Sequence, residues 1–216
     1  MSNDIFIHEA AYRGEMFLEK LSKMHITICG VGAIGSNLVD TLSRQGFSNL
    51  RVVDMDRVEI HNVNTQIYGM DDIGALKVDA LKNNIFRVSK VEIETFNKEL
   101  KSQTVKKFLK KTDLVVDAFD NSESRKLLQD FCRDNKIKLI HAGLFEDYGE
   151  VVWDEQYSVP ANSQEGDVCD YPLARNLAVL VSTLTAEEIV NYALADKPRL
   201  RSVAVTLKDF KVSPYR

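Results

Sequence analysis

The chain has 216 residues and a mass of 24.5 kDa, enough for one sizeable hydrophobic core, and we expect a single domain over residues 1–216. Its 44% apolar and 28% charged residues are ordinary for a globular protein, and a net charge of −4 gives no overall attraction to nucleic acid or to anionic membranes. Because no apolar run approaches ~20 residues and the N-terminus is too polar for a signal peptide, we expect a cytoplasmic protein without a membrane partner.

The first predicted element is an amphipathic helix within residues 1–24. In the stretch "HEAAYRGEMFLEKLSK", the apolar residues Ala10, Phe17, Leu18 and Leu21 suit a helix that lies on the body of the protein.

Strand and helix patterns then alternate from Ile26 to about Trp153. The patterns predict strands at residues 26–29, 50–54, 91–96, 113–119, 137–143 and 149–154, and helices at 33–44, 75–88, 103–110 and 122–135. This alternation of short apolar strands with helices predicts an α/β fold, a Rossmann-like doubly wound and mostly parallel sheet with helices on both faces.

The last third of the chain has a different character. Residues 155–172 form a long irregular segment, and loops of this length are usually functional or mobile. A long helix is predicted at 173–194, and the alternating residues 201–216 predict an edge strand.

A glycine-rich turn joins the first strand to its helix. Gly30, Gly32 and Gly35 form a G-x-G-x-x-G motif, and the helix that starts at Ala33 would offer its free N–H groups to a phosphate. Asp54, at the end of the second strand, is placed to accept hydrogen bonds from ribose hydroxyls. We therefore expect a bound nucleotide, but either ATP or NAD would satisfy these residues.

The cysteines and histidines show no metal-binding spacing. Cys29, Cys132 and Cys169 include no C-x-x-C pair, and the four histidines lie far apart, so we predict no structural metal. Cys29 lies within a predicted strand and Cys132 on the apolar face of a predicted helix, so we expect both to be buried.

Further motifs follow in order along the chain. An acidic pair, Asp54 and Asp56, follows the second strand, and Asn62 and Gln66 come next. A helix then starts with a G-x-x-K motif within Ile73 to Lys77. A later strand ends in D-x-x-D-N, which is Asp117 with Asp120 and Asn121. Together with the glycine turn they resemble the ThiF/MoeB/HesA family, the bacterial relatives of ubiquitin-activating enzymes. The resemblance runs from about Leu21 to Ala195.

This resemblance implies an adenylyltransferase. Such enzymes bind Mg-ATP and transfer AMP to the C-terminal carboxylate of a small ubiquitin-like or sulfur-carrier protein that ends in Gly-Gly, usually as homodimers. Carried over residue by residue, it makes Asp120 the Mg²⁺ ligand and Lys77 a catalytic cation. The implied nucleotide-binding residues are Gly30, Gly32, Ala33, Gly35, Asp54, Asp56, Asn62, Gln66, Lys77 and Asn121.

Two of these assignments have an ordinary alternative. Lys77 could be a surface lysine, and one of Asp117 and Asp120 could simply be a turn residue that caps the next helix.

The arginines match the family pattern less well. An arginine normally stands directly before the glutamine, and here that position is Thr65, which removes one positive charge. Arg125, one turn into the helix after Asp120, matches a family arginine, and Arg13 could enter the site of a neighbouring subunit. Each is nearly as compatible with an ordinary surface residue.

Cys169 could act in a later transfer step. It lies in the segment that matches the family's crossover loop, where some members carry a cysteine that accepts the acyl group. Asp167 and Asp170 would raise its pKa, since nearby negative charge disfavours the thiolate, so a non-catalytic role is at least equally compatible.

Four functional hypotheses remain open. The preferred one is activation of a ubiquitin-like or sulfur-carrier protein. The second is ATP-dependent activation of a non-protein substrate such as a tRNA base, which the low positive charge disfavours. The third is a weakly catalytic ATP-binding scaffold, suggested by Thr65. The fourth is an NAD-dependent oxidoreductase, although the sequence shows no set of residues with a paired histidine that would support hydride transfer.

Overall fold

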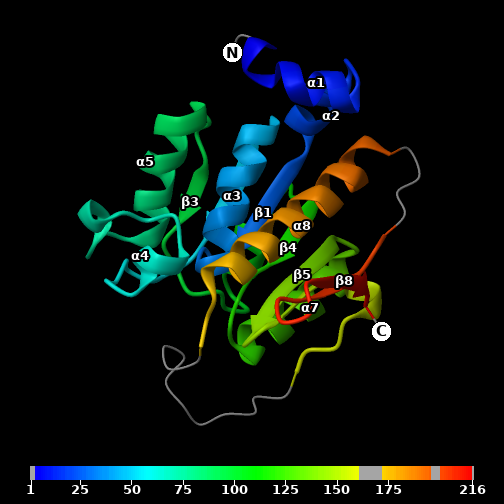
Figure 1. The fold of residues 1–216 in the computed structure, drawn as a ribbon. Coiled ribbons are helices and arrows are strands. Elements are labelled where there is room, and N and C mark those ends of the chain that lie inside the picture. The colour runs from blue at the N-terminus through cyan, green and yellow to red at the C-terminus, as the bar shows by residue number, and fades with distance from the viewer. Residues whose placement is uncertain (1–2, 161–171, 196–199, 216) are drawn as a thin grey trace.

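A single sheet of eight strands forms the centre of the fold (Figure 1). The computed structural model describes residues 3–160, 172–195 and 200–215. The strand order is β3-β2-β1-β4-β5-β6-β7-β8, in which the first five strands are parallel and the last three join antiparallel. The strands are β1 (His25–Cys29), β2 (Asn49–Val53), β3 (Glu94–Phe96), β4 (Leu114–Asp117), β5 (Lys138–Phe145), β6 (Tyr148–Trp153), β7 (Val203–Thr206) and β8 (Lys211–Pro214). The predicted doubly wound, mostly parallel sheet is therefore confirmed.

Helices cover both faces of the sheet, as predicted. On one face α3 (Ala33–Gln45), α5 (Lys77–Ser89) and α8 (Arg175–Leu194) enclose the larger core, and α3 runs beside α8 over the strands in Figure 1. On the other face α6 (Val105–Phe108) and α7 (Ser122–Asn135) enclose a smaller core. Central strands are buried on both sides, which explains their continuous apolar sequences.

The N-terminal segment differs from the single helix that its periodicity predicts. It forms η1 (Asn3–Phe6), α1 (Ile7–Arg13) and α2 (Phe17–Lys23). Gly14 separates the two α-helices because its φ of +93° is one that a continuing helix cannot adopt. The predicted contacts remain, since Phe17 and Leu21 are buried against the larger core.

Several other elements differ in length from the prediction. The helix predicted at 103–110 is the four-residue α6, the strand predicted at 91–96 is only β3, and the C-terminal segment forms a hairpin of β7 and β8 rather than one edge strand. The remaining short helices are α4 (Asn62–Thr65), η2 (Met70–Asp72) and η3 (Asp154–Gln156).

Helix α8 is the one described helix that resembles a membrane span in length and composition, although the sequence analysis expected no apolar run of that length. An 18-residue window of this 20-residue helix has a mean hydropathy of 1.3, so the helix is long and apolar enough to cross a membrane by length and composition alone. Half of that window is buried within the fold. Ser182 Oγ on α8 donates to the carbonyl of Ile34 on α3 at 2.9 Å, which ties the two helices together.

Candidate functional site

The glycine turn brings the start of α3 to the carboxyl edge of the parallel strands. Gly30 follows β1 with a φ of +89°, and its N–H donates to Val53 O at 2.9 Å. A Cβ on Gly30 would stand 2.7 Å from Ala118 O, so only glycine lets the turn pass the end of β4. The start of α3 thus lies where the sheet order changes direction between β1 and β4, the usual ligand position in doubly wound folds.

Asp54 connects this turn to the end of β2. Its Oδ2 accepts the N–H of Val31 and its Oδ1 accepts the N–H of Asp56, both at 2.8 Å. The side chain is 7% exposed, and burial raises its pKa, although Lys77 and the two N–H groups act in the opposite direction. Each carboxylate oxygen can accept a second hydrogen bond, so a ribose hydroxyl remains a compatible partner.

Lys77 is the first residue of α5 and is buried, not the ordinary surface lysine that the sequence left open. Its Nζ donates to Oδ2 of Asp56 at 3.0 Å. Burial of the stem and this ion pair hold the ammonium at one place on the edge of the sheet.

A cleft of about 130 Å³ opens between these groups. Seven of the predicted site residues line it, from the segments that follow β1, β2 and β4 and from the start of α5. The residues that line it are Gly30, Gly32, Asp54, Met55, Asp56, Lys77, Lys98, Glu99, Leu100, Ala118, Phe119, Asp120, Asn121 and Ser124. Sequence reasoning missed Lys98, Glu99 and Leu100, whose only signal is that they follow the third strand of a parallel sheet.

Asp117 and Asp120 have separate roles. Asp117 is fully buried, and its Oδ1 accepts the N–H of Phe119 at 3.0 Å. Asp120 is exposed in the cleft, and among the described residues its carboxylate contacts only the amide of Asn121, at 3.5 Å. The helix cap is instead Asn121, whose Oδ1 accepts the N–H of Ser124 at 2.8 Å.

The donor chemistry of Asp120 fits Mg²⁺. Nucleotide enzymes commonly hold this ion with one or two carboxylates and the phosphates of the substrate. An exposed carboxylate beside the start of α3, without a cationic partner among the described residues, has the chemistry of such a ligand.

Four other predicted residues are not among those that line the cleft. Ala33 begins α3, and Gly35 packs against Gly30. Asn62 is buried and its Oδ1 accepts the N–H of Glu59 at 2.9 Å. Gln66, at the end of α4, is 8% exposed, and its Oε1 has no hydrogen-bond donor among the described residues.

Arg125 is not among the residues that line the cleft. Its Nε and Nη2 donate to the carbonyl of Phe119, and its Nη1 donates to the hydroxyl of Tyr157 at 2.6 Å. In this arrangement the guanidinium holds the residue before Asp120 in place, and it is a positioning residue for that loop.

Arg13 is also engaged within its own chain. Its guanidinium contacts Glu9 on α1 and Glu187 on α8, and the second contact measures 2.7 Å. Arg13 therefore does not line the cleft of its own chain, and its role in the site of a neighbouring subunit stays a prediction.

A buried histidine network was not anticipated. His141 on β5 lies 2.8 Å from Oδ2 of Asp117 through Nδ1 and 3.3 Å from Oδ1 of Asp154 through Nε2, and its ring stacks on Tyr157. Because Tyr157 also receives the hydrogen bond from Arg125, this network supports the loop that carries Asp120. No local motif marks it, since its members are up to 40 positions apart.

The two described cysteines are buried, as predicted. Burial raises the pKa of Cys29 well above its usual value and that of Cys132 to about 12. Cys169 and most of the predicted crossover loop lie outside the described residues.

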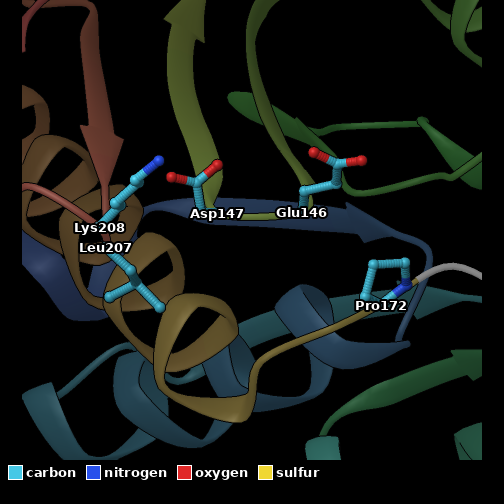
Figure 2. Close-up of a pocket in the computed structure, with 5 residues that line it drawn as sticks. All are labelled: Glu146, Asp147, Pro172, Leu207 and Lys208. Atoms are coloured by element: carbon cyan, nitrogen blue, oxygen red, sulfur yellow. The ribbon is translucent and has the colours of Figure 1, made fainter.

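A second, wider hollow of about 640 Å³ lies beyond β5 on the same edge of the sheet (Figure 2). It is lined by Glu146, Asp147, Pro172, Leu207 and Lys208. The two turns that bear these residues contact each other directly, since Leu207 N–H donates to Asp147 O at 2.9 Å. This hollow joins the turn between β5 and β6 to the turn between β7 and β8.

Comparison with known proteins agrees with the fold and the motifs. The model of the ThiF family matches residues 6–205. The tRNA threonylcarbamoyladenosine dehydratase of Haemophilus influenzae is 30% identical over 129 residues, which are 58% of this chain and 49% of that protein. The probable molybdopterin-synthase adenylyltransferase of Porphyra purpurea is 26% identical over 209 residues, or 90% of this chain and 54% of that protein. The chain thus spans about half the length of each of these two relatives.

A solved structure of Escherichia coli MccB with ATP has the same fold. It superposes with a TM-score of 0.83 at 16% identity, and the match covers 100% of this chain and 72% of MccB.

Proposed function

Because the chain belongs to the ThiF family, we propose that it is an ATP-dependent adenylyltransferase. Its substrate in this proposal is the C-terminal glycine carboxylate of a small ubiquitin-like or sulfur-carrier protein, and it acts as a homodimer. The relatedness to an adenylyltransferase over 90% of the chain supports this class of reaction.

One observation carries the proposal. The glycine turn, Asp54, Lys77 and Asp120 come from four separate segments of the chain, yet all line one cleft at the carboxyl ends of β1, β2 and β4. A structural turn alone would not require a buried lysine and an exposed carboxylate at the same place.

Each group has a defined task in the reaction. Asp54 accepts the ribose hydroxyls, and the N-terminus of α3 binds the phosphates. The carboxylate of the partner attacks the α-phosphorus, the bond from that phosphorus to the bridging oxygen breaks, and pyrophosphate leaves. Lys77 stabilises the charge that develops on the phosphates, and little acid–base assistance is needed. Mg²⁺ held by Asp120 would neutralise further phosphate charge.

The first experiment is a thermal shift with Mg-ATP and, separately, with NAD⁺ and NADH. A ligand at ~100 times its Kd adds about 2.7 kcal/mol, which raises the Tm of a chain of this size by roughly 5 to 10 °C. We expect stabilisation by Mg-ATP alone. Stabilisation by the dinucleotide alone would overturn the proposal in favour of an oxidoreductase.

The second experiment tests the reaction itself. With a small carrier protein ending in Gly-Gly, we expect exchange of radioactive pyrophosphate into ATP, and no exchange with the same protein lacking its terminal glycines. Carrier proteins encoded beside this chain are the first to test.

A tRNA base is a second candidate substrate. The 30% identity to a tRNA threonylcarbamoyladenosine dehydratase favours it, while the net charge of −4 does not. Pyrophosphate exchange stimulated by tRNA and not by any carrier protein would select this alternative.

A further inference from the structure

The cleft is short of positive charge for a triphosphate. Four carboxylates and two ammonium groups line it: Asp54, Asp56, Glu99 and Asp120 against Lys77 and Lys98. One of the two cations, Lys77, is already paired with Asp56 at 3.0 Å. Like charges repel strongly where water is partly excluded, so tight binding of a polyphosphate calls for a further cation near the start of α3.

Arg175, the first residue of α8, stands next to that place. Its Nη1 donates to the carbonyl oxygens of Asn64 and Gln66 at 3.3 and 3.4 Å. The residue between them, Thr65, is held from the other side by α3, since Asn37 Nδ2 donates to Thr65 O at 3.0 Å. The same short segment therefore touches Arg175 and the first turns of the phosphate-binding helix.

The contacts of Arg175 are weak enough to be exchanged for a ligand. Its side chain is exposed, and one nitrogen shares two long hydrogen bonds with neutral carbonyls. A guanidinium forms shorter and stronger bonds to phosphate, in a two-pronged geometry that suits adjacent oxygens.

Gln66, whose backbone carbonyl Arg175 contacts, also carries an unmatched polar group on its side chain. Gln66 is 8% exposed and its Oε1 has no donor within the described part of the chain. A rotation of the side-chain amide of Gln66 by half a turn would exchange Oε1 for the NH₂ group. A phosphate oxygen could then accept a hydrogen bond from this NH₂ group. Buried amides are rarely left without a partner, so this one marks a place where a ligand completes the bonding.

We propose that Arg175 is a catalytic residue that binds the outer phosphates of ATP and stabilises the departing pyrophosphate. The inference rests on the proposed function and adds to it a cation from α8. Asp54 fixes the ribose end of the nucleotide in this proposal. The guanidinium of Arg175, held on the segment that contacts α3, then meets the β- and γ-phosphates. The guanidinium compensates charge on the oxygen that leaves when the α-phosphorus is transferred.

The test measures binding of Mg-ATP, pyrophosphate and AMP by calorimetry for Arg175→Ala and Arg175→Lys. Arg44→Ala is the matched control, because Arg44 is an exposed arginine at the far end of α3 that pairs with Asp40. We expect Arg175→Ala to weaken Mg-ATP and pyrophosphate about 10- to 100-fold and AMP less than about 2-fold. Arg175→Lys should be intermediate, and Arg44→Ala unchanged.

The outcomes separate the two proposals. If the wild-type chain binds Mg-ATP and Arg175→Ala binds it equally well, the role of Arg175 is overturned while the proposed function stands. Equal weakening of ATP and AMP together with a lower Tm would also overturn it, because that pattern indicates a merely structural role. Absence of ATP binding by the wild-type chain would overturn both.

Discussion

The carbonyl oxygen of Gly30 lies only 2.0 Å from the point where a Cβ on Gly35 would stand. Gly35→Ala should therefore force α3 away from the turn and lower stability by about 3 kcal/mol or more, or roughly 6 to 12 °C in Tm. Thermal unfolding without ligand measures this effect.

Gly32→Ala is the contrasting substitution in the same motif. A Cβ there meets no atom within 4 Å, and the residue lines the cleft. We expect a stability change within about 1 kcal/mol but Mg-ATP binding at least about 10-fold weaker, because the methyl group takes the space through which phosphate approaches the backbone. Equal Tm losses for the two variants would contradict this division of roles.

Asp120→Asn should abolish Mg-dependent pyrophosphate exchange. The side chain is exposed and makes no ion pair with a described residue, so the Tm without ligand should change by less than about 2 °C. The conservative amide keeps the shape and removes the charge that Mg²⁺ requires. Pyrophosphate exchange by Asp120→Asn at the wild-type rate would contradict the role of Asp120 as a Mg²⁺ ligand.

Asp154 should make the fold sensitive to acid. Burial acts to raise its pKa, but hydrogen bonds from His141, Arg133 and Gln129 outweigh burial and lower the pKa from the ordinary 3.8 to about 2. Between these two values the unfolded chain binds a proton that the folded chain does not, so this contribution to stability is present above pH ~4 and is lost as the pH falls towards 2.

Urea unfolding at several pH values between 5 and 2 tests this sensitivity. Asp154→Asn should be less stable than wild type at pH 7 and lose less stability across the acid range. An identical slope in both proteins would show that Asp154 does not contribute.

The buried thiols should resist alkylation. Since burial raises the pKa of Cys29 and brings that of Cys132 to about 12, almost no thiolate exists at pH 8. Mass spectrometry after iodoacetamide treatment should find both unmodified in the native protein and modified after unfolding in urea. Rapid native labelling of either would show that the smaller core opens.

Cys169→Ala should leave adenylate formation intact. The adenylation residues named above do not include a thiol, so pyrophosphate exchange should stay within about 2-fold of wild type. A transfer assay that loses a thioester or persulfide product in this variant would assign Cys169 to the later step, and an unchanged product would make it an ordinary loop cysteine.

Local patterns predicted the parallel part of the fold well. The apolar strands before Gly30 and Asp54 and the helix after Asn121 were placed to within a residue or two, because each is bounded by a turn or cap with a clear physical signature. The hairpin of β7 and β8 was not distinguished from one strand, since its turn at Lys208 and Asp209 lacks glycine or proline.

The site residues could be predicted where a sequence motif contains the residue types that nucleotide binding requires. Gly30, Asp54, Lys77 and Asp120 do meet in one cleft. Sequence spacing could not show that Arg125 turns towards Phe119 and Tyr157, or that Arg175 reaches the segment around Thr65, because both depend on side-chain directions between distant elements.

The pairing of α3 with α8 also has a consequence for how the chain is made. The apolar face of α3, with Leu38, Val39 and Leu42, is covered by a helix that begins about 130 residues after α3 ends. At roughly 5 to 20 residues per second, a ribosome needs about 7 to 26 s to reach that helix. During this interval the apolar face of α3 lacks its partner helix, and such exposed apolar surface makes a growing polypeptide prone to aggregate.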